Sequence, residues 1–292
     1  MENQTASRSA AIIAAHRAFD SSKNIGERIC YDPFARHFLP PGFTVIGKTE
    51  MPEETALEVF KNIVPGFHEY FLARTRYIDE YLQESIKSGL QQLVILGAGY
   101  DSRAYRFDEL KSSVKIFEVD HPATQKVKKN KLFKIFQALP DHVTYVPVDF
   151  KKDNLQSCLP NNGYDNSLKT VFIWEGVTMY IDQATVNETL LFVSKNKGQG
   201  SSIIFDHTYR EVVDGTHESK EAKGWLKIAE KSNEPLLFGL HNDTIERFLL
   251  SSGFCNIVRI TSEFFNDNYY VGINRDRRAT AILSIAHAEI AS

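Results

Sequence analysis

The chain has little cysteine and no apolar run long enough to span a membrane. Its three cysteines, Cys30, Cys158 and Cys255, are odd in number and far apart. Disulfide frameworks and zinc sites need clustered cysteines, so neither is expected, and the scarcity is typical of a reducing compartment. The apolar run from Ala10 to Ala15 is too short to cross a bilayer and makes a poor signal peptide. We therefore expect a soluble, cytoplasmic protein without a metal ion.

An excess of charge of one sign is also absent. The 292 residues include 34 basic and 37 acidic side chains, for a formal net charge of -3. This balance gives no electrostatic reason to expect nucleic acid or an anionic membrane as a partner. Repeats, low-complexity segments and the phosphate-binding pattern G-x-x-x-x-G-K-[ST] are missing as well. The length favours one α/β domain, residues 1–292, with added segments over two independent domains.

The most informative stretch of the chain is 92–103. Leu93 to Leu96 is a short apolar run that suits a strand buried on both faces of a parallel sheet. Gly97 and Gly99 then allow a tight turn and let a ligand lie against bare backbone. Ser102 stands where a third glycine would complete the dinucleotide pattern G-x-G-x-x-G. The stretch is typical of a nucleotide-binding loop without being specific for NAD, and a purely structural turn remains an alternative.

Strands and helices alternate along the rest of the chain. This order predicts a parallel sheet with helices on both faces. Further strands are expected at 115–120, 142–150, 169–174, 201–205, 254–261 and 279–288. Helices are expected at 6–20, 67–87, 122–138, 182–195 and 243–252, with a short helix starting at 31–35 and a loop at 43–55. Residues 210–240 interrupt the alternation and are predicted to be an insertion over the site.

Three predicted strands end in an acid, at Asp120, Asp149 and Glu175. Ligands of open α/β sheets bind outside the carboxyl ends of the strands, so these acids are predicted to border one site with the glycine loop. Asp120 lies about twenty residues beyond that loop, where a carboxylate takes the ribose hydroxyls of a nucleoside. A cap on the following helix is its structural alternative.

Arg74 falls near the middle of the apolar stripe of the predicted helix at 67–87. An inward guanidinium needs an anionic partner. The partner is either a structural carboxylate or the carboxylate of a bound ligand. The acids at the strand ends disfavour a phosphate-rich ligand, whereas a nucleoside with a positive centre and an amino-acid tail fits. S-adenosylmethionine is such a molecule, and Arg74 is the candidate for holding its carboxylate.

Five stretches resemble the leucine carboxyl methyltransferase family of S-adenosylmethionine-dependent enzymes. They are Asp32-Pro33-Phe34-Ala35, Arg74-Thr75-Arg76-Tyr77-Ile78-Asp79, Leu96-Gly97-Ala98-Gly99-Tyr100-Asp101-Ser102-Arg103, Phe117-Glu118-Val119-Asp120-His121-Pro122 and Trp174-Glu175-Gly176-Val177-Thr178-Met179-Tyr180. The family includes protein phosphatase 2A carboxyl methyltransferases and polyketide O-methyltransferases. The resemblance implies a Rossmann-like seven-stranded methyltransferase sheet with an N-terminal helical lid segment, 1–66, and an inserted lid segment, 210–240.

The resemblance also implies roles for single residues. Arg74 would grip the methionine carboxylate, Gly97 would lie under the cofactor, and Asp120 would take the ribose. Asp149 with Phe150, a position where many relatives have leucine, would border the adenine, and Glu175 would lie near the methionine amino group. An N-terminal basic residue reaches the cofactor in some relatives, and the sequence leaves Arg17 and Lys23 as alternatives.

The catalytic residues depend on the acceptor. A carboxylate is ionised at pH 7 and needs no base, whereas a phenol usually needs one. His207 is the base candidate, with an ordinary polar residue at a strand end as its alternative. Tyr180 and Arg210 are candidates for orienting a substrate carboxylate, and packing is the alternative for Tyr180.

The expected activity is O-methylation of a carboxylate or hydroxyl of a small molecule, without metal. Methylation of a protein C-terminus is the alternative within the class. An NAD-dependent oxidoreductase and a non-catalytic cofactor-binding protein are alternatives of other classes. The oligomeric state is left open by the sequence.

Overall fold

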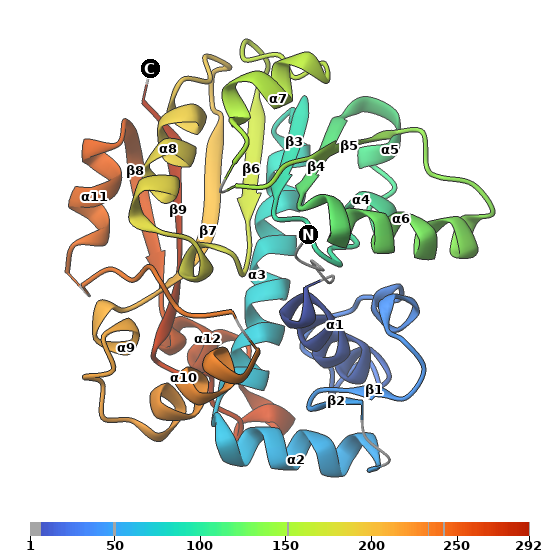
Figure 1. Cartoon of the computed structure of the whole chain (residues 1–292), viewed down its shortest axis with the longest axis vertical. Coiled ribbons are helices and arrows are strands. Elements are labelled where there is room, and N and C mark those ends of the chain that lie inside the picture. Colours follow the sequence, from blue (N-terminus) through green and yellow to red (C-terminus); the bar gives the residue numbers. More distant parts are fainter. Residues whose placement is uncertain (1–6, 49–50, 151, 233, 242, 292) are drawn as a thin grey trace.

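A seven-stranded sheet forms the centre of the computed structural model, which describes residues 7–48, 51–150, 152–232, 234–241 and 243–291 (Figure 1). The strands run in the order β5-β4-β3-β6-β7-β9-β8, with β9 antiparallel to both of its neighbours and the other pairs parallel. They are β3 (Gln92–Leu96), β4 (Lys115–Asp120), β5 (Val143–Pro147), β6 (Thr170–Trp174), β7 (Ser202–Thr208), β8 (Phe254–Ile260) and β9 (Leu283–Ile290). The predicted Rossmann-like α/β sheet is confirmed.

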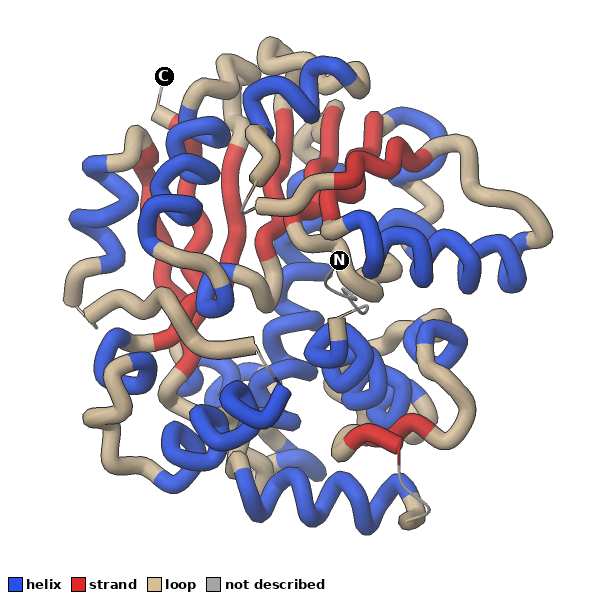
Figure 2. The backbone as a smooth tube through the Cα atoms, in the orientation of Figure 1, coloured by secondary structure: helices blue, strands red, loops and turns tan. Residues whose placement is uncertain are grey.

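The central strand β3 is buried along its whole length, as its unbroken apolar run predicts. Because side chains alternate across a strand, Leu93 and Ile95 pack into one apolar core, and Val94 and Leu96 into another. The first core includes residues of α3 (Phe67–Lys87) and the second includes residues of α8 (Gln183–Ser194). The sheet is therefore covered on both faces (Figure 2).

Helices follow most of the strands. They are α4 (Arg103–Arg106), α5 (Leu110–Ser113), α6 (Pro122–Phe136), α7 (Leu155–Asn161), η2 (Thr178–Tyr180), α11 (Ile245–Ser251), α12 (Ser262–Asn268) and η3 (Gly272–Asn274). Asp182 caps α8 as predicted, because its side chain accepts a hydrogen bond from the Thr185 backbone N–H. In the described part of the chain, no helix is long and apolar enough to cross a membrane.

The N-terminal segment and the inserted segment lie at the end of the sheet where the parallel strands finish (Figure 1). The first contributes α1 (Arg8–Ser21), η1 (Ala35–Phe38), β1 (Phe43–Thr44), β2 (Gly47–Lys48) and α2 (Glu53–Ile63). The second contributes α9 (Arg210–Val213) and α10 (Lys220–Ser232). Their helices, with the start of α3, enclose the space above the strand ends.

The sequence prediction fails in two places near the N-terminus. The predicted loop at 43–55 contains a short antiparallel hairpin, Phe43 opposite Lys48, and the start of α2. The short helix expected from 31–35 is a 3-10 turn that starts only at Ala35. Asp32 still caps this turn, because its carboxylate accepts hydrogen bonds from the N–H groups of Phe34 and Ala35.

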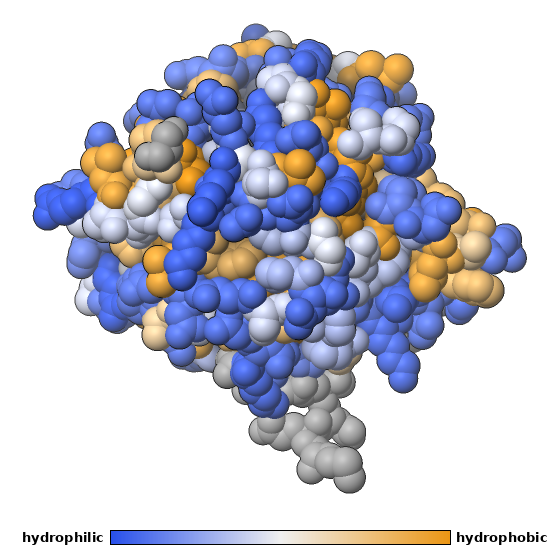
Figure 3. All heavy atoms as spheres, turned by 90° about the horizontal axis from the view of Figure 1, so that it is seen from above, coloured by the Kyte–Doolittle hydropathy of each residue, from blue (hydrophilic) through white to orange (hydrophobic). Residues whose placement is uncertain are grey.

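One lysine of α6 does not lie at the surface. Lys128 is buried, and its Nζ lies 2.8 Å from the equally buried carboxylate of Glu118 on β4. Burial requires such a pairing, because a lone ammonium in the core is strongly unfavourable. The face drawn in Figure 3 is mostly hydrophilic, with apolar residues gathered in smaller areas.

Candidate active site

A cavity of about 320 Å³ lies at the carboxyl ends of the parallel strands. Its lining comes from the glycine loop, the ends of β4, β6 and β7, and the helices α1, α2, α3 and α10. Seven residues predicted to bind the cofactor reach it: Arg74, Gly97, Gly99, Asp120, Asp149, Phe150 and Glu175. The fold therefore brings together groups that are far apart in the sequence, as expected of this edge of an α/β sheet.

The glycine loop has a backbone that only glycine adopts easily. Gly97 has a φ of +67°, and a Cβ there would lie 2.3 Å from Cγ2 of Val177. Gly99 donates its N–H to the carboxylate of Asp120 over 2.7 Å. The loop is thus fixed from both sides, against the turn after β6 and against the end of β4.

Asp120 is a partly buried acid of the cavity, and one of its oxygens accepts the hydrogen bond from Gly99. Its other oxygen accepts a hydrogen bond from the N–H of His121 over 2.7 Å, and burial raises the pKa of its carboxyl group. The Oδ2 atom of Asp149, at the end of the next strand, lies 3.9 Å from Nε2 of His121 and 3.4 Å from Nζ of Lys152. Phe150 completes this side of the cavity with an aromatic wall.

Arg74 is held by two acids. Its Nε donates to Glu175 over 2.9 Å, and its Nη1 donates to Asp206. Arg103 donates to the other oxygen of Glu175 over 2.6 Å. Burial by itself raises the pKa of Glu175, but Arg103 and Arg74 outweigh it and lower that pKa to about 2. Glu175 is therefore ionised at neutral pH and fixes two guanidinium groups.

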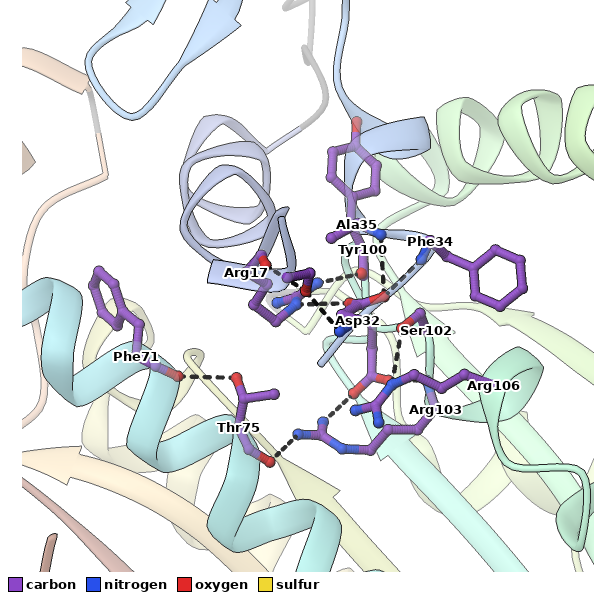
Figure 4. Close-up of polar contacts among 12 residues, drawn as sticks. Arg17, Asp32, Phe34, Ala35, Phe71, Thr75, Tyr100, Ser102, Arg103 and Arg106 are labelled. Atoms are coloured by element: carbon purple, nitrogen blue, oxygen red, sulfur yellow. Dashed lines mark hydrogen bonds and ion pairs between the residues drawn. The ribbon is translucent and has the colours of Figure 1, made fainter. Parts of the chain in front are cut away.

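Arg17 of α1 reaches the cavity, whereas Lys23 does not. Figure 4 shows Arg17 between Asp32 and the main chain of Tyr100. Its Nε donates to Asp32 over 2.9 Å and its Nη2 to the Tyr100 carbonyl over 2.6 Å. Lys23 instead pairs with Asp20 over 3.0 Å. Of the two basic residues left open by the sequence, Arg17 is placed at the site.

The residues predicted for acceptor chemistry lie in different places. Tyr180 lines the cavity, and burial raises the pKa of its hydroxyl to about 12, so it is a neutral donor at pH 7. The structure does not bring His207 to the cavity lining. Its ring is buried among Phe205 and Tyr209, and burial lowers its pKa to about 4. Arg210 is 41% exposed and pairs with Asp214 away from the cavity.

The sequence interpretation missed several residues that the structure places here. Asp206 pairs with Arg74, and the rule that acids at strand ends border the site could have found it, because it directly follows the strand predicted at 201–205. Glu234 lines the cavity from the inserted segment and accepts hydrogen bonds from the hydroxyls of Ser7 and Ser9. No pattern in the sequence points to Glu234.

One end of the cavity is apolar and aromatic. The ring of Phe67 contacts two other aromatic rings. Its centroid lies 5.2 Å from that of Trp225 and 5.7 Å from that of Phe71. Phe60, Val64 and Ile228 extend this wall. The wall comes from α2, α3 and α10, and it meets the polar end at Arg74, whose guanidinium lies 5.5 Å from the centre of the Phe71 ring. Among the described residues, no three His, Cys, Asp or Glu side chains are grouped to hold a metal ion.

The sheet order and the cavity define the chain as a protein with the Rossmann-like methyltransferase fold. The structure of a Thermobifida fusca protein, provisionally named a methyltransferase, matches all of this chain and 97% of its own, with a TM-score of 0.62 at 10% identity. A DUF574-family protein from Streptomyces avermitilis matches with a TM-score of 0.59 at 12% identity, over 98% of both chains. These likenesses concern the fold.

The sequence comparison gives the family. The model of the leucine carboxyl methyltransferase family matches residues 10–194, and the chain belongs to this family. A Bacillus subtilis protein provisionally named S-adenosyl-L-methionine-dependent methyltransferase YktD is 33% identical over 74% of this chain and 71% of its own. A similarly named Streptomyces coelicolor protein is 27% identical over 77% of each chain.

Proposed function

We propose that this chain, an S-adenosylmethionine-dependent methyltransferase, transfers the methyl group to a carboxylate or hydroxyl oxygen of a small molecule. The observation that carries the proposal is the division of one cavity into a polar end at the strand tips and an apolar, aromatic end under the lid helices. A cofactor and an acceptor need two such ends in one enclosed space. The relatives' names supply the cofactor.

The polar end fits S-adenosylmethionine. Gly97 lines the cavity with its backbone, and the absence of a side chain lets Val177 pack against the loop. Asp120 presents a partly buried carboxylate for the ribose hydroxyls, and Asp149 with Phe150 lies beyond it for the adenine. The hydrogen bonds of Arg74 to its two acids use Nε and Nη1, so Nη2 is the atom for the methionine carboxylate.

The cofactor supplies an activated methyl group, and the chain's own residues supply alignment. Glu175 and Asp206 hold the Arg74 guanidinium in place before a ligand binds, so its position costs no reorganisation. Helices α1, α2 and α10 line the cavity opposite the strand ends, and their closing over bound ligands would limit loss of the methyl group to solvent. Tyr180, neutral and close to both ends, donates a hydrogen bond to the acceptor.

The size and character of the apolar end favour a small acceptor. An apolar ring or chain buries its surface against Phe67, Phe71 and Trp225, whereas a peptide also brings polar backbone groups that this wall leaves without partners. A protein C-terminus is therefore the second choice.

We place the reaction in the cytoplasm, and the three free cysteines support a reducing compartment.

The cofactor assignment is tested by calorimetric titration with S-adenosylhomocysteine. We expect one site per chain, and Asp120→Ala to lose roughly 1–3 kcal/mol of binding free energy because a charged hydrogen bond is removed. Asp108→Ala removes an exposed carboxylate and is the control. Binding of NAD by a protein with no affinity for S-adenosylhomocysteine would instead favour the oxidoreductase alternative.

The acceptor class is tested with methyl-labelled cofactor and three pools: small carboxylic acids, small hydroxyl compounds, and peptides with a free C-terminus. Label is expected in one of the small-molecule pools. A product that releases methanol in alkali is a methyl ester, and a stable one is an ether. Label confined to the peptides would contradict the small-molecule proposal, and slow methyl loss to water alone would favour a non-catalytic binding protein.

A further inference from the structure

Glu234 is an acid of the cavity lining that lies near Tyr180. It follows α10, and its N–H donates to the carbonyl of Ala229 over 3.1 Å. The next part of the chain is fixed by a hydrogen bond of 2.8 Å from the Leu237 N–H to the Met179 carbonyl. Since Met179 precedes Tyr180, this bond holds Glu234 beside the tyrosine. The charge of Glu234 indeed adds to the burial that raises the pKa of Tyr180.

Two serines hold the Glu234 carboxylate from the other side of the cavity. The hydroxyls of Ser7 and Ser9, at the start of α1, both donate to it, the first over 3.3 Å. The described residues include no Lys or Arg in an ion pair with Glu234. The carboxylate is therefore oriented by neutral donors, and no cation among these residues offsets its charge.

Positive charge is scarce at this end of the cavity. The described lining has two arginines and no lysine. Arg17 is bound to Asp32 and to the Tyr100 carbonyl, and Arg74 to Glu175 and Asp206. The guanidinium of Arg74 lies 5.5 Å from the centre of the Phe71 ring, but its charge is offset by its two acids. An acceptor carboxylate at the apolar end would therefore lie near Glu234 without a free cation, which is unfavourable in an enclosed, partly dry site.

From this distribution of charge we infer that Glu234 is an acceptor-binding residue that selects a hydroxyl group against a carboxylate. The inference rests on the proposed function and narrows it. The acceptor is an apolar, preferably aromatic molecule whose body packs on Phe67, Phe71 and Trp225. Its hydroxyl donates a hydrogen bond to Glu234, and Tyr180 donates to the acceptor oxygen. A hydroxyl is both a donor and an acceptor, so it satisfies both groups, whereas a carboxylate satisfies only the tyrosine.

The test compares two probes that share one ring system, 2-naphthol and 2-naphthoate. Their dissociation constants are measured by calorimetry and by the fluorescence of Trp225, with and without S-adenosylhomocysteine. The wild-type protein is expected to bind 2-naphthol at least ten times more tightly than 2-naphthoate. In Glu234→Gln, which keeps the shape and removes the charge, the preference is expected to fall to within about threefold.

Two control variants separate charge from packing. Glu230→Gln removes an exposed carboxylate from α10 and is expected to keep the wild-type preference. Ser9→Ala removes one serine hydrogen bond but leaves the charge of Glu234, so the preference persists. Equal or tighter binding of 2-naphthoate by the wild type, an unchanged preference in Glu234→Gln, or no binding of either probe each overturns the inference.

The outcome is separable from that of the proposed function. Loss of S-adenosylhomocysteine binding in the wild type would overturn the cofactor assignment, whereas the ratio between the two probes is measured in its absence as well. Binding of S-adenosylhomocysteine within twofold of wild type in Glu234→Gln is expected, because Ser7 and Ser9, which hold its carboxylate, are not among the residues proposed to hold the cofactor.

Discussion

At the scale of single residues, Arg74 shows how a structural role and a binding role combine. The sequence offered a structural carboxylate or a ligand carboxylate as its partner. In the structure Glu175 and Asp206 bind two of its nitrogens, while the side chain still lines the cavity. The structural partner is therefore present, and the binding of a ligand carboxylate by Arg74 stays a prediction.

Replacing Arg74 by alanine is expected to destabilise the fold by about 3–5 kcal/mol, because two buried acids lose a shared cation. Arg76→Ala is the matched control on the same helix. Arg76 is 39% exposed and pairs with Glu80, so its loss is expected to cost at most about 1 kcal/mol. Urea unfolding at pH 7 measures both, and equal losses would contradict a buried role for Arg74.

The lowered pKa of Glu175 predicts how the stability of the fold depends on pH. Its pKa falls from 4.5 in the unfolded chain to about 2 in the folded protein, a difference that corresponds to about 3 kcal/mol. A lowered pKa stabilises the fold above pH 4.5, and this contribution is lost as the pH falls toward 2. The stability advantage of wild type over Glu175→Gln is thus expected to shrink below pH 5 in urea unfolding.

The control for that series is Glu188→Gln, which removes an exposed carboxylate from α8. If the advantage of wild type over Glu175→Gln stayed constant from pH 7 to pH 3.5, the ion pairs with Arg103 and Arg74 would not hold Glu175 ionised, and the assignment of its role would be wrong.

At the scale of helices and strands, the spacing of apolar residues correctly predicted elements that belong to the sheet or pack on it. The helix predicted at 67–87 is α3 with the same bounds, because its apolar stripe faces the core continuously. The strand at 115–120 is β4. The α2 helix was missed although Ala56, Leu57 and Phe60 are buried. It lies in the lid, begins after Pro52 without a side-chain cap, and leaves only a short apolar stripe.

The contact between α10 and α2 predicts how one methyl group added at Gly224 changes the free energy of unfolding. A Cβ on Gly224 of α10 would lie 2.2 Å from the Ile63 carbonyl oxygen at the end of α2. An alanine in an exposed helix position normally stabilises by about 1 kcal/mol relative to glycine. Here the sign of the effect is expected to reverse. Gly224→Ala is expected to lower the free energy of unfolding by about 1–3 kcal/mol, because the backbone at Ile63 cannot shift without disturbing α2.

Urea unfolding of Gly224→Ala measures this sign. Lys227→Ala, an exposed change on the same helix, controls for altered helix propensity. A stabilised Gly224→Ala protein would mean that α10 does not pack closely on α2, and the lid would then be looser than the structure has it.

At the scale of the whole molecule, the cofactor end of the site follows from a general rule and the acceptor end does not. Strand order and the carboxyl-end rule are enough to predict that Asp120, Asp149 and Glu175 surround one cavity, and all three line it. Glu234 and Trp225 reach the same cavity only because the inserted segment folds back over it. That arrangement depends on tertiary packing between segments far apart in sequence, which no local pattern records.

The lid helix α1 lies directly over the glycine loop, so ligand binding and lid opening are expected to be coupled. A Cβ on Gly99 would lie 3.2 Å from Cβ of Ala10, and Ile13 and Arg17 also line the cavity. At a concentration 100 times its dissociation constant, a ligand stabilises the bound state by about 2.7 kcal/mol. Amides of α1 that exchange through lid opening are therefore expected to exchange about 100-fold more slowly with S-adenosylhomocysteine bound.

Hydrogen exchange monitored by mass spectrometry measures this coupling peptide by peptide. The internal control is α8, which packs on the opposite core and contributes no residue to the cavity. Amides of α8 that open locally are expected to exchange at the same rate with and without the ligand. Protection of α8 equal to that of α1 would mean that the ligand only stabilises the molecule globally. No protection of α1 would mean that α1 opens independently of the cofactor, and the lid would then have to close from α10 and the Glu234 segment alone.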